Sequence, residues 1–212
     1  MKLHQKAVAL IEGDAGSGVK CLGTAFCFIK SNWFVTAKHV VIDQNGNPMS
    51  ELRLKINGDD KFPIQMIYAH KLRDIALMEF NGELCPQPLY PAHWDHDASK
   101  GLIKCGYSPS ITGEKNQLVL NTNHVREFET YERQREDGNE LIFEFDDEYS
   151  EGGNSGGPIF AVDGGVVAVA IDSVSNGDKF RTKATDSKVL LDFVELNGRS
   201  LDVINPWAQP SA

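Results

Sequence analysis

Short apolar runs separated by turn residues dominate the chain, and only one segment shows the period of an amphipathic helix. The runs are rich in Val, Ile, Leu and Phe, which is typical of β-strands. Asn-Gly and Asp-Gly-Gly sequences lie between several of them and favour tight turns. The pattern predicts strands over residues 7–11, 22–29, 34–36, 52–56, 64–69, 75–80, 102–106, 118–121, 141–145, 158–162 and 166–171.

The segment that departs from this strand pattern lies near the C-terminal end. Residues 187–196 place apolar side chains at helical spacing. Thr185 or Asp186 precedes them as a candidate cap, and Gly198 follows them as a terminator. We therefore expect one helix here, after the last strands.

Two further segments show neither the strand pattern nor helical spacing. Residues 81–100 combine prolines with scattered charges, and we interpret them as a linker between two strand-rich halves. Residues 127–140 are dense in charges of both signs, a composition typical of a solvated surface excursion. The predicted halves are residues 1–90 and 91–212.

Composition and charge exclude several classes of protein. A chain of 212 residues with 41% apolar content can bury a sizeable core. Its net charge of −9 argues against nonspecific binding to nucleic acid or to an anionic membrane. No apolar run is long enough to cross a bilayer, and the run at 7–11 is too short for the core of a signal peptide. The sequence therefore favours a cytoplasmic location.

The metal-binding residue types do not form a convincing metal site. The four cysteines, Cys21, Cys27, Cys85 and Cys105, lack metal-ligand spacing, and we expect buried free thiols, with a Cys21–Cys27 bridge left open. The acid-flanked histidine pair within 93–97 lies in the predicted linker and is interpreted as part of a solvated loop. No metal and no cofactor is predicted.

Three segments carry groups suited to nucleophilic catalysis. Ser155 lies in the glycine-rich, proline-closed turn 151–158, where little would shield its hydroxyl. A serine nucleophile needs a base to take its proton and amide donors for the oxyanion. His39 follows the strand-like run 34–36, and Asp74 opens the strand-like run 75–80, both in the first half. The amides of Gly153 and Ser155 are candidate donors to the oxyanion.

These segments also carry a family resemblance. Thr36-Ala37-Lys38-His39, Asp74-Ile75-Ala76-Leu77 and Gly153-Asn154-Ser155-Gly156-Gly157-Pro158 together resemble the trypsin/chymotrypsin-like serine proteases, with the same His, Asp, Ser order. Asn154, in place of an aspartate that pairs with a newly cut N-terminus, resembles the bacterial HtrA-type branch, so no activating N-terminal cleavage is expected. The resemblance implies one all-β protease domain, made of two six-stranded antiparallel β-barrels and a C-terminal helix.

The resemblance also implies roles for individual residues. Ser155 would be the nucleophile, His39 the general base, and Asp74 the group that orients His39. Gly153 and Ser155 would form the oxyanion hole. An extended substrate would pair with a strand after the active turn, and Asp172 on it either points into the pocket or faces solvent. The implied substrate-binding residues are Tyr149, Ser150, Ala170, Ile171 and Asp172.

The function implied is a serine endopeptidase that cleaves protein or peptide substrates without a cofactor. By family analogy, such a chain resembles a dedicated cytoplasmic processing protease or a stress or defence protease. The turn 150–154 has adjacent glycines and lacks the locking ion pair, which leaves room for ordering by an activating partner protein. The alternative is a binding module that keeps the protease fold without turnover.

Overall fold

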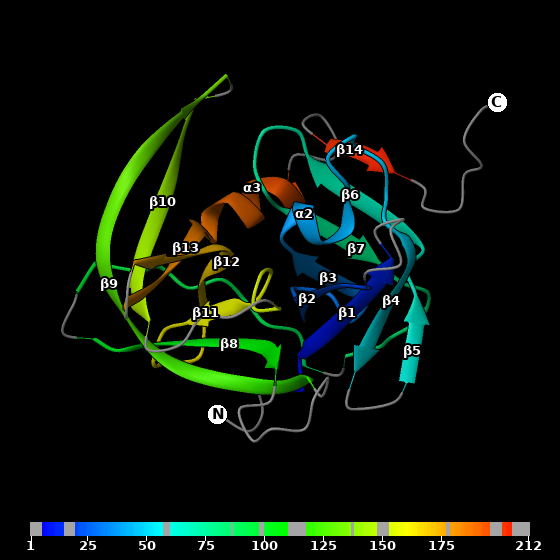
Figure 1. The fold of residues 1–212 in the computed structure, drawn as a ribbon, viewed down its shortest axis with the longest axis horizontal. Coiled ribbons are helices and arrows are strands. Elements are labelled where there is room, and N and C mark those ends of the chain that lie inside the picture. The colour runs from blue at the N-terminus through cyan, green and yellow to red at the C-terminus, as the bar shows by residue number, and fades with distance from the viewer. Residues whose placement is uncertain are drawn as a thin grey trace.

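Two strand-rich halves lie side by side, with short helices near their junction (Figure 1). The computed structural model describes residues 6–14, 20–56, 60–85, 87–97, 100–109, 118–136, 138–147, 153–176, 179–195 and 201–204. Within these residues every pairing between named strands is antiparallel. No described helix is both long and apolar enough to cross a membrane.

The first half is an eight-stranded sheet in the order β14-β6-β7-β3-β2-β1-β4-β5. Helix α2 (Lys38–Val41) follows β3 directly. The C-terminal strand β14 joins this sheet by pairing with β6, after the chain has completed the second half. The strands are β1 (Val8–Asp14), β2 (Lys20–Cys27), β3 (Trp33–Thr36), β4 (Ser50–Ile56), β5 (Asp60–Pro63), β6 (Met66–His70), β7 (Ala76–Glu79) and β14 (Leu201–Ile204).

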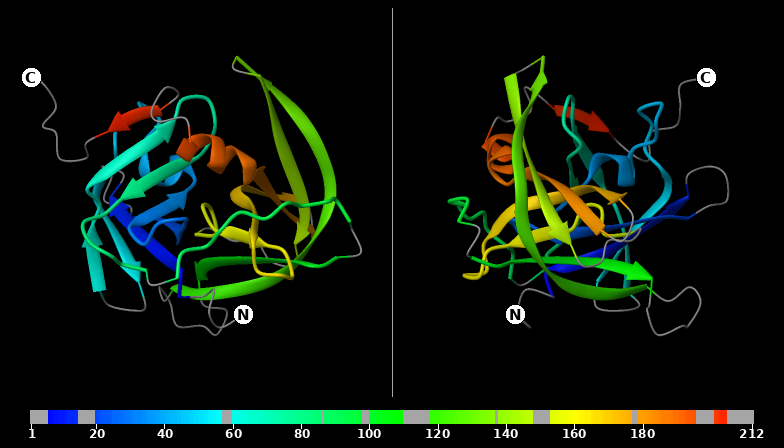
Figure 2. Two further views of the ribbon diagram at one scale, coloured as in Figure 1. Left: turned by 180° about the vertical axis from the view of Figure 1, so that it is seen from behind. Right: turned by 60° about the vertical axis from the view of Figure 1, so that its left-hand side comes forward.

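The second half is a closed barrel in the order β10-β13-β12-β11-β8-β9. Two of its strands, β9 and β10, extend far beyond the barrel as a curved hairpin, which the two further views in Figure 2 show from behind and from the side. Helix α3 (Lys188–Glu195) follows the last barrel strand. The strands are β8 (Leu102–Pro109), β9 (Leu118–Arg135), β10 (Gly138–Asp147), β11 (Pro158–Phe160), β12 (Val166–Asn176) and β13 (Lys179–Asp186).

The predicted all-β fold of two antiparallel halves with a C-terminal helix is confirmed. The second half is the expected six-stranded barrel. The first half is an eight-stranded sheet and not a six-stranded barrel, because β5 and β14 add to the six strands expected there. The helix begins within one residue of its predicted start. Of the two candidate caps, Asp186 accepts a hydrogen bond from the Lys188 amide at 2.9 Å.

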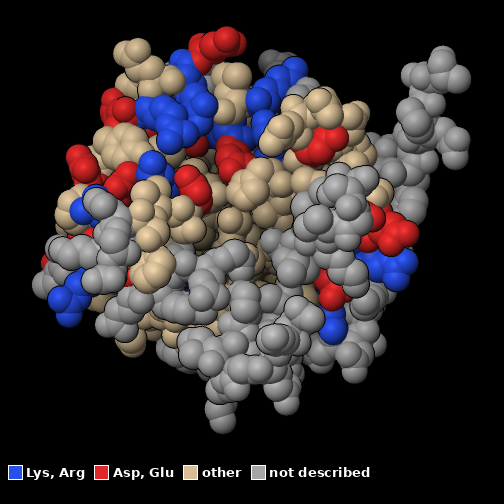
Figure 3. All heavy atoms as spheres, in the orientation of Figure 1, with Lys and Arg blue, Asp and Glu red and all other residues tan. Residues whose placement is uncertain are grey.

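The charged segment 127–140 is not an irregular surface excursion but the outer part of the β9–β10 hairpin. Its charges are compatible with strands because many of them face solvent. Arg135 near the tip forms an ion pair with the buried Glu140 at 2.8 Å. Acidic and basic side chains are interspersed over the half of the molecule that carries this hairpin (Figure 3).

The connecting segment is tied to both halves, in keeping with its prediction as a linker. Leu89 forms a parallel bridge with Phe28 of the first half, and Pro91 forms one with Val166 of the barrel. One core cluster also runs from the first sheet into barrel residues such as Ile171. The division at residues 90 and 91 remains a prediction, and the two halves share a continuous apolar core.

The described cysteines are free thiols. Cys27, Cys85 and Cys105 are all buried, as expected from the absence of metal-ligand spacing. The Cys27 thiol donates to the Lys30 carbonyl oxygen at 3.1 Å. Because Cys27 is free, the bridge to Cys21 that the sequence left open is not formed.

A buried ion pair lies inside the closed barrel. Lys104 on β8 contacts the carboxylate of Asp147 at the end of β10, and both side chains are almost fully buried. Thr182 on β13 donates to Asp147 Oδ2 at 2.7 Å, and Lys104 Nζ donates to Thr182 at 3.2 Å. Burial lowers the pKa of Lys104 although Asp147 opposes the shift. The cluster ties three barrel strands together by charge.

We predict that Lys104→Met destabilises the protein by about 3 to 5 kcal/mol, because it leaves the Asp147 carboxylate buried without its cation. Urea unfolding monitored by circular dichroism measures this loss. The double variant Lys104→Met/Asp147→Leu should lose less free energy of unfolding than the sum of the two single variants. Strictly additive losses would show that the two charges are not coupled.

Candidate active site

The pairing of β3 with β7 places His39 and Asp74 at one edge of the first sheet. Thr36 at the end of β3 lies opposite Ala76 at the start of β7. Because the strands are antiparallel, the residues after Thr36 and before Ala76 emerge on the same side. Val40 and Val41 on α2 are buried and hold the single helical turn that carries His39.

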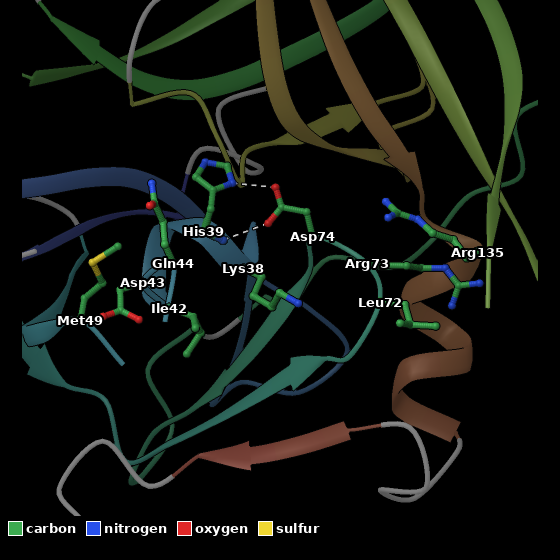
Figure 4. A pocket seen from close by; sticks show the side chains of 10 residues that line it. All are labelled: Lys38, His39, Ile42, Asp43, Gln44, Met49, Leu72, Arg73, Asp74 and Arg135. Carbon is green, nitrogen blue, oxygen red and sulfur yellow. Dashed lines mark hydrogen bonds and ion pairs between the residues drawn. The ribbon is translucent and has the colours of Figure 1, made fainter. Parts of the chain in front are cut away.

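Asp74 binds His39 through both carboxylate oxygens. Oδ2 lies 2.6 Å from His39 Nδ1, and Oδ1 accepts a hydrogen bond from the His39 backbone amide at 2.9 Å (Figure 4). Nδ1 is therefore the donor nitrogen of a neutral ring, which leaves Nε2 as the acceptor. This arrangement fixes both the tautomer and the orientation of the His39 ring, as a general base would require.

The charges around this pair set their protonation. The Asp74 hydrogen bond raises the pKa of His39 against an opposing effect of burial, and the negative charges of Asp74 and Asp172 add to the increase. Burial opposes ionisation of Asp74, but the hydrogen bonds and charge of His39 keep the pKa of Asp74 below its usual range. The pair therefore favours an imidazolium when a proton arrives.

Steric constraints explain why glycines occur in the active turn, residues 153–157. Gly153 has a φ of +103°, and a Cβ there would lie 2.6 Å from the Tyr107 carbonyl oxygen. Gly156 has a φ of +87°, and its Cβ would lie 2.1 Å from the Thr24 carbonyl oxygen and 2.9 Å from the Ala37 amide nitrogen. Only glycine meets both constraints at these positions.

Hydrogen bonds to both halves hold the active turn. The Ser155 carbonyl accepts from the Thr24 amide of β2 at 2.8 Å. On the other side, the Gly156 amide donates to the Ala170 carbonyl at 2.7 Å, and the Ala170 amide donates to the Gly157 carbonyl at 2.9 Å. The turn is thus positioned between β2 of the sheet and β12 of the barrel.

The structure brings the predicted catalytic segments together but does not join Ser155 to His39 by a hydrogen bond. Gly156, next to Ser155, lies so close to Ala37 that a Cβ on it would be 2.9 Å from the Ala37 amide nitrogen, and Ala37 lies two residues before His39. Within the described residues, however, no hydrogen bond joins Ser155 Oγ to the His39 ring. The His39–Asp74 pair is formed, and the serine turn lies beside it.

The predicted substrate-binding residues differ in where the structure places them. Tyr149 and Ser150 lie outside the described residues. Both backbone groups of Ala170 bind the active turn, so they are not available to a substrate strand. Ile171 is buried, while Asp172 is exposed and its Oδ1 accepts from the Ser173 amide at 2.8 Å. Of the two orientations considered for Asp172, the structure has the solvent-facing one.

A cavity of about 500 Å³ opens beside the His39–Asp74 pair. Ile42 and Met49 contribute apolar walls, and Arg73 and Arg135 line it as well (Figure 4). Arg135 comes from the tip of the β9–β10 hairpin. This hairpin of the barrel therefore reaches the pocket beside the His39–Asp74 pair of the first half. Sequence reasoning missed this contribution because it assigned the hairpin to a solvated excursion.

Comparison with known proteins agrees with this geometry. The chain belongs to the family of trypsin-like peptidase domains, whose model matches residues 23–169. The search of curated proteins found no match to the sequence.

The similar solved structures share the fold at low sequence identity. The Rv3671c protease from M. tuberculosis in its active form has a TM-score of 0.71 and 18% identity, over 99% of this chain and 85% of that one. The HtrA-type protease AlgW with a tripeptide has a TM-score of 0.68 and 14% identity, over 93% of this chain and 63% of its own. The MamO protease domain from Magnetospirillum magneticum has a TM-score of 0.64 and 14% identity, over 90% and 97% of the two chains.

We predict that Asp74→Asn lowers the pKa of His39, because the variant removes the hydrogen-bonded charge that raises it. The His39 imidazole, followed by NMR as pH is varied, should titrate above 6.5 in the wild type and at a lower pH in the variant. Since a base must be neutral, the acid side of any activity profile should move to lower pH with it. Asp172→Asn, as the matched control, should lower the pKa by less. An unchanged His39 pKa in Asp74→Asn would contradict the assigned pairing.

Proposed function

We propose that this chain is a serine endopeptidase in which Ser155 attacks the peptide carbonyl and His39 accepts the serine proton. The observation that carries the proposal is the bidentate Asp74–His39 contact beside a glycine-constrained turn that bears a serine. Asp74 would stabilise the protonated His39, which then returns the proton to the leaving amine. The amides of Gly153 and Ser155 would bind the oxyanion.

The open edge of β12 supports an extended polypeptide as the substrate. Strand β11 pairs with β12 only as far as Val169, so beyond that residue the only described strand that pairs with β12 is β13. Residues 172–175 on this stretch are exposed. A substrate strand added at the open edge would gain main-chain hydrogen bonds. Solved structures of AlgW, an HtrA-type protease, hold a tripeptide and a decapeptide. We propose Tyr149 and Ser150 as the opposite wall.

The biological setting extends the proposal by analogy with the family. By this analogy the chain would be a dedicated processing enzyme, or a stress or defence protease of the cytoplasm. Control by an activating partner protein fits the adjacent glycines before Ser155 and the uncharged Asn154, which could not pair with a newly cut N-terminus. Neither role requires a metal or a cofactor, since the proposed chemistry uses only His39, Asp74 and Ser155.

A second candidate function is a binding module that keeps the protease fold without turnover. The lack of a hydrogen bond between Ser155 Oγ and the His39 ring favours the binding module, because a nucleophile needs its base within hydrogen-bond reach. Catalytic hydrogen bonds in ligand-free proteases often close only when substrate binds. The two candidates therefore differ in whether Ser155 reacts.

We predict that a fluorophosphonate probe labels wild-type protein at Ser155, and that Ser155→Ala abolishes labelling. His39→Ala should reduce the rate by on the order of 10⁴-fold, since the three residues act as a unit. Gel fluorescence and peptide mass spectrometry measure the rate and the labelled residue. Ser50→Ala, which changes an exposed serine on β4, is the matched control and should label normally. Labelling at another serine, or none at all in folded protein, would favour the binding module.

A further inference from the structure

Thr24 occupies a position between the sheet and the active turn that the proposed chemistry does not explain. It lies on β2, opposite Leu10 of β1, and is fully buried. A buried hydroxyl needs hydrogen-bond partners, because leaving it unpaired costs free energy. The partners of Thr24 lie far away in sequence, in the second half of the chain.

Thr24 binds the carbonyls of both residues proposed to form the oxyanion hole. Its backbone amide donates to the Ser155 carbonyl at 2.8 Å. Its hydroxyl donates to the Gly153 carbonyl at 2.6 Å, in a buried hydrogen bond. One residue of the first half therefore fixes the turn on either side of Asn154.

The direction of the Thr24 hydroxyl proton is determined by its other neighbour. The Tyr107 backbone amide, on β8 of the barrel, donates to Thr24 Oγ1 at 2.8 Å. Since this amide can only donate, Oγ1 must accept from it, and the single hydroxyl proton is left for Gly153. A side-chain rotation that moves Oγ1 away would therefore break both hydrogen bonds.

The rest of Thr24 is held equally firmly. Its carbonyl oxygen accepts from the Thr36 hydroxyl at 2.7 Å. Gly106 lies so close that a Cβ there would be 3.3 Å from Thr24 Oγ1 and 2.6 Å from Asn154 Oδ1. Both amide-to-carbonyl contacts and side-chain contacts thus converge on one residue, which has little freedom to move.

The turn needs such a restraint because Gly153 could adopt other conformations. Its φ of +103° is one of several that glycine reaches without strain. The Gly153 amide lies in the peptide plane before that residue, and the Gly153 carbonyl lies in the plane after it. The Thr24 hydrogen bond fixes the second plane. Because the two planes meet at the Gly153 Cα, loss of this restraint would give the φ of Gly153 more freedom and let the amide turn away from an oxyanion.

We propose that Thr24 is a positioning residue that holds the Gly153 peptide in the orientation that stabilises the oxyanion. This inference rests on the proposed function, since it assigns Thr24 a role in the same site. It extends the site to strand β2. That strand carries neither the proposed nucleophile nor its base. The hydroxyl acts through Gly153 and does not touch the reacting atoms.

The test compares Thr24→Val, which keeps the shape but removes the hydroxyl, with Thr24→Ser, which keeps the hydroxyl. Fluorophosphonate labelling at Ser155 is measured over a range of probe concentrations to separate the maximal rate from probe affinity. Thr24→Val should lower the maximal rate at least about tenfold with probe affinity changed less than about twofold, because the probe's phosphoryl oxygen needs the oxyanion donors only as the bond forms. Thr24→Ser should remain within about threefold of wild type.

Thr130→Val is the matched control, because it also removes a threonine hydroxyl that donates to an oxygen acceptor, here Glu127 on the β9 arm. It should label as wild type does. The His39 pKa, read by NMR in Thr24→Val, should be unchanged, since a general loss of structure would alter it. A folded Thr24→Val that labels at the wild-type maximal rate would overturn the proposal.

If Thr24→Val does not fold, Thr24→Cys replaces it, since a thiol is a weaker donor in a similar volume. Its maximal rate should lie below that of Thr24→Ser, and equal rates would overturn the inference. If wild-type protein itself fails to label, the proposed function is wrong. The outcomes for the two proposals are thus separate.

Discussion

The close approach of the active turn to the backbone of β2 is the constraint on which the rest of the site depends. A Cβ on Gly156 would lie 2.1 Å from the Thr24 carbonyl oxygen and 2.2 Å from the Thr36 hydroxyl oxygen. The turn comes from the barrel, and both threonines come from the sheet. Strand β3 ends at Thr36, three residues before His39, and pairs with β7, which begins two residues after Asp74. Any shift of the turn relative to β2 therefore also moves it relative to the His39–Asp74 pair.

Most of the fold could be predicted from the sequence because its strands are short apolar runs bounded by turn residues. The helix near 187–196 was predicted from its spacing and cap, and Asp186 acts as that cap. The outer part of the β9–β10 hairpin was missed because exposed strands with charged residues on their outer positions resemble loops in composition. Strand β14 was missed because its pairing with β6 depends on a chain reversal that no local pattern encodes.

The candidate site divides in the same way. His39, Asp74 and Ser155 could be identified because each lies in a local motif, and the glycines around Ser155 are explained by backbone contacts. Thr24 could not be assigned a role, since its hydrogen bond to Gly153 spans 129 residues. Arg135 reaches the pocket only through the curvature of a long hairpin. A sequence shows which residue types are present, while partners across the two halves follow from packing.

The long-range anchoring of the active turn also determines when the site forms during folding. His39 and Asp74 belong to the first half, whereas Ala170, which binds Gly156 and Gly157, lies fifteen residues beyond Ser155. Contacts between such distant segments form late because closing large loops costs entropy. A growing chain on the ribosome would carry the histidine and even the serine before the turn could take its shape. Under the proposed function, hydrolytic competence would then arrive only after the chain's own extended segments have been buried, which would protect the nascent chain from cutting itself.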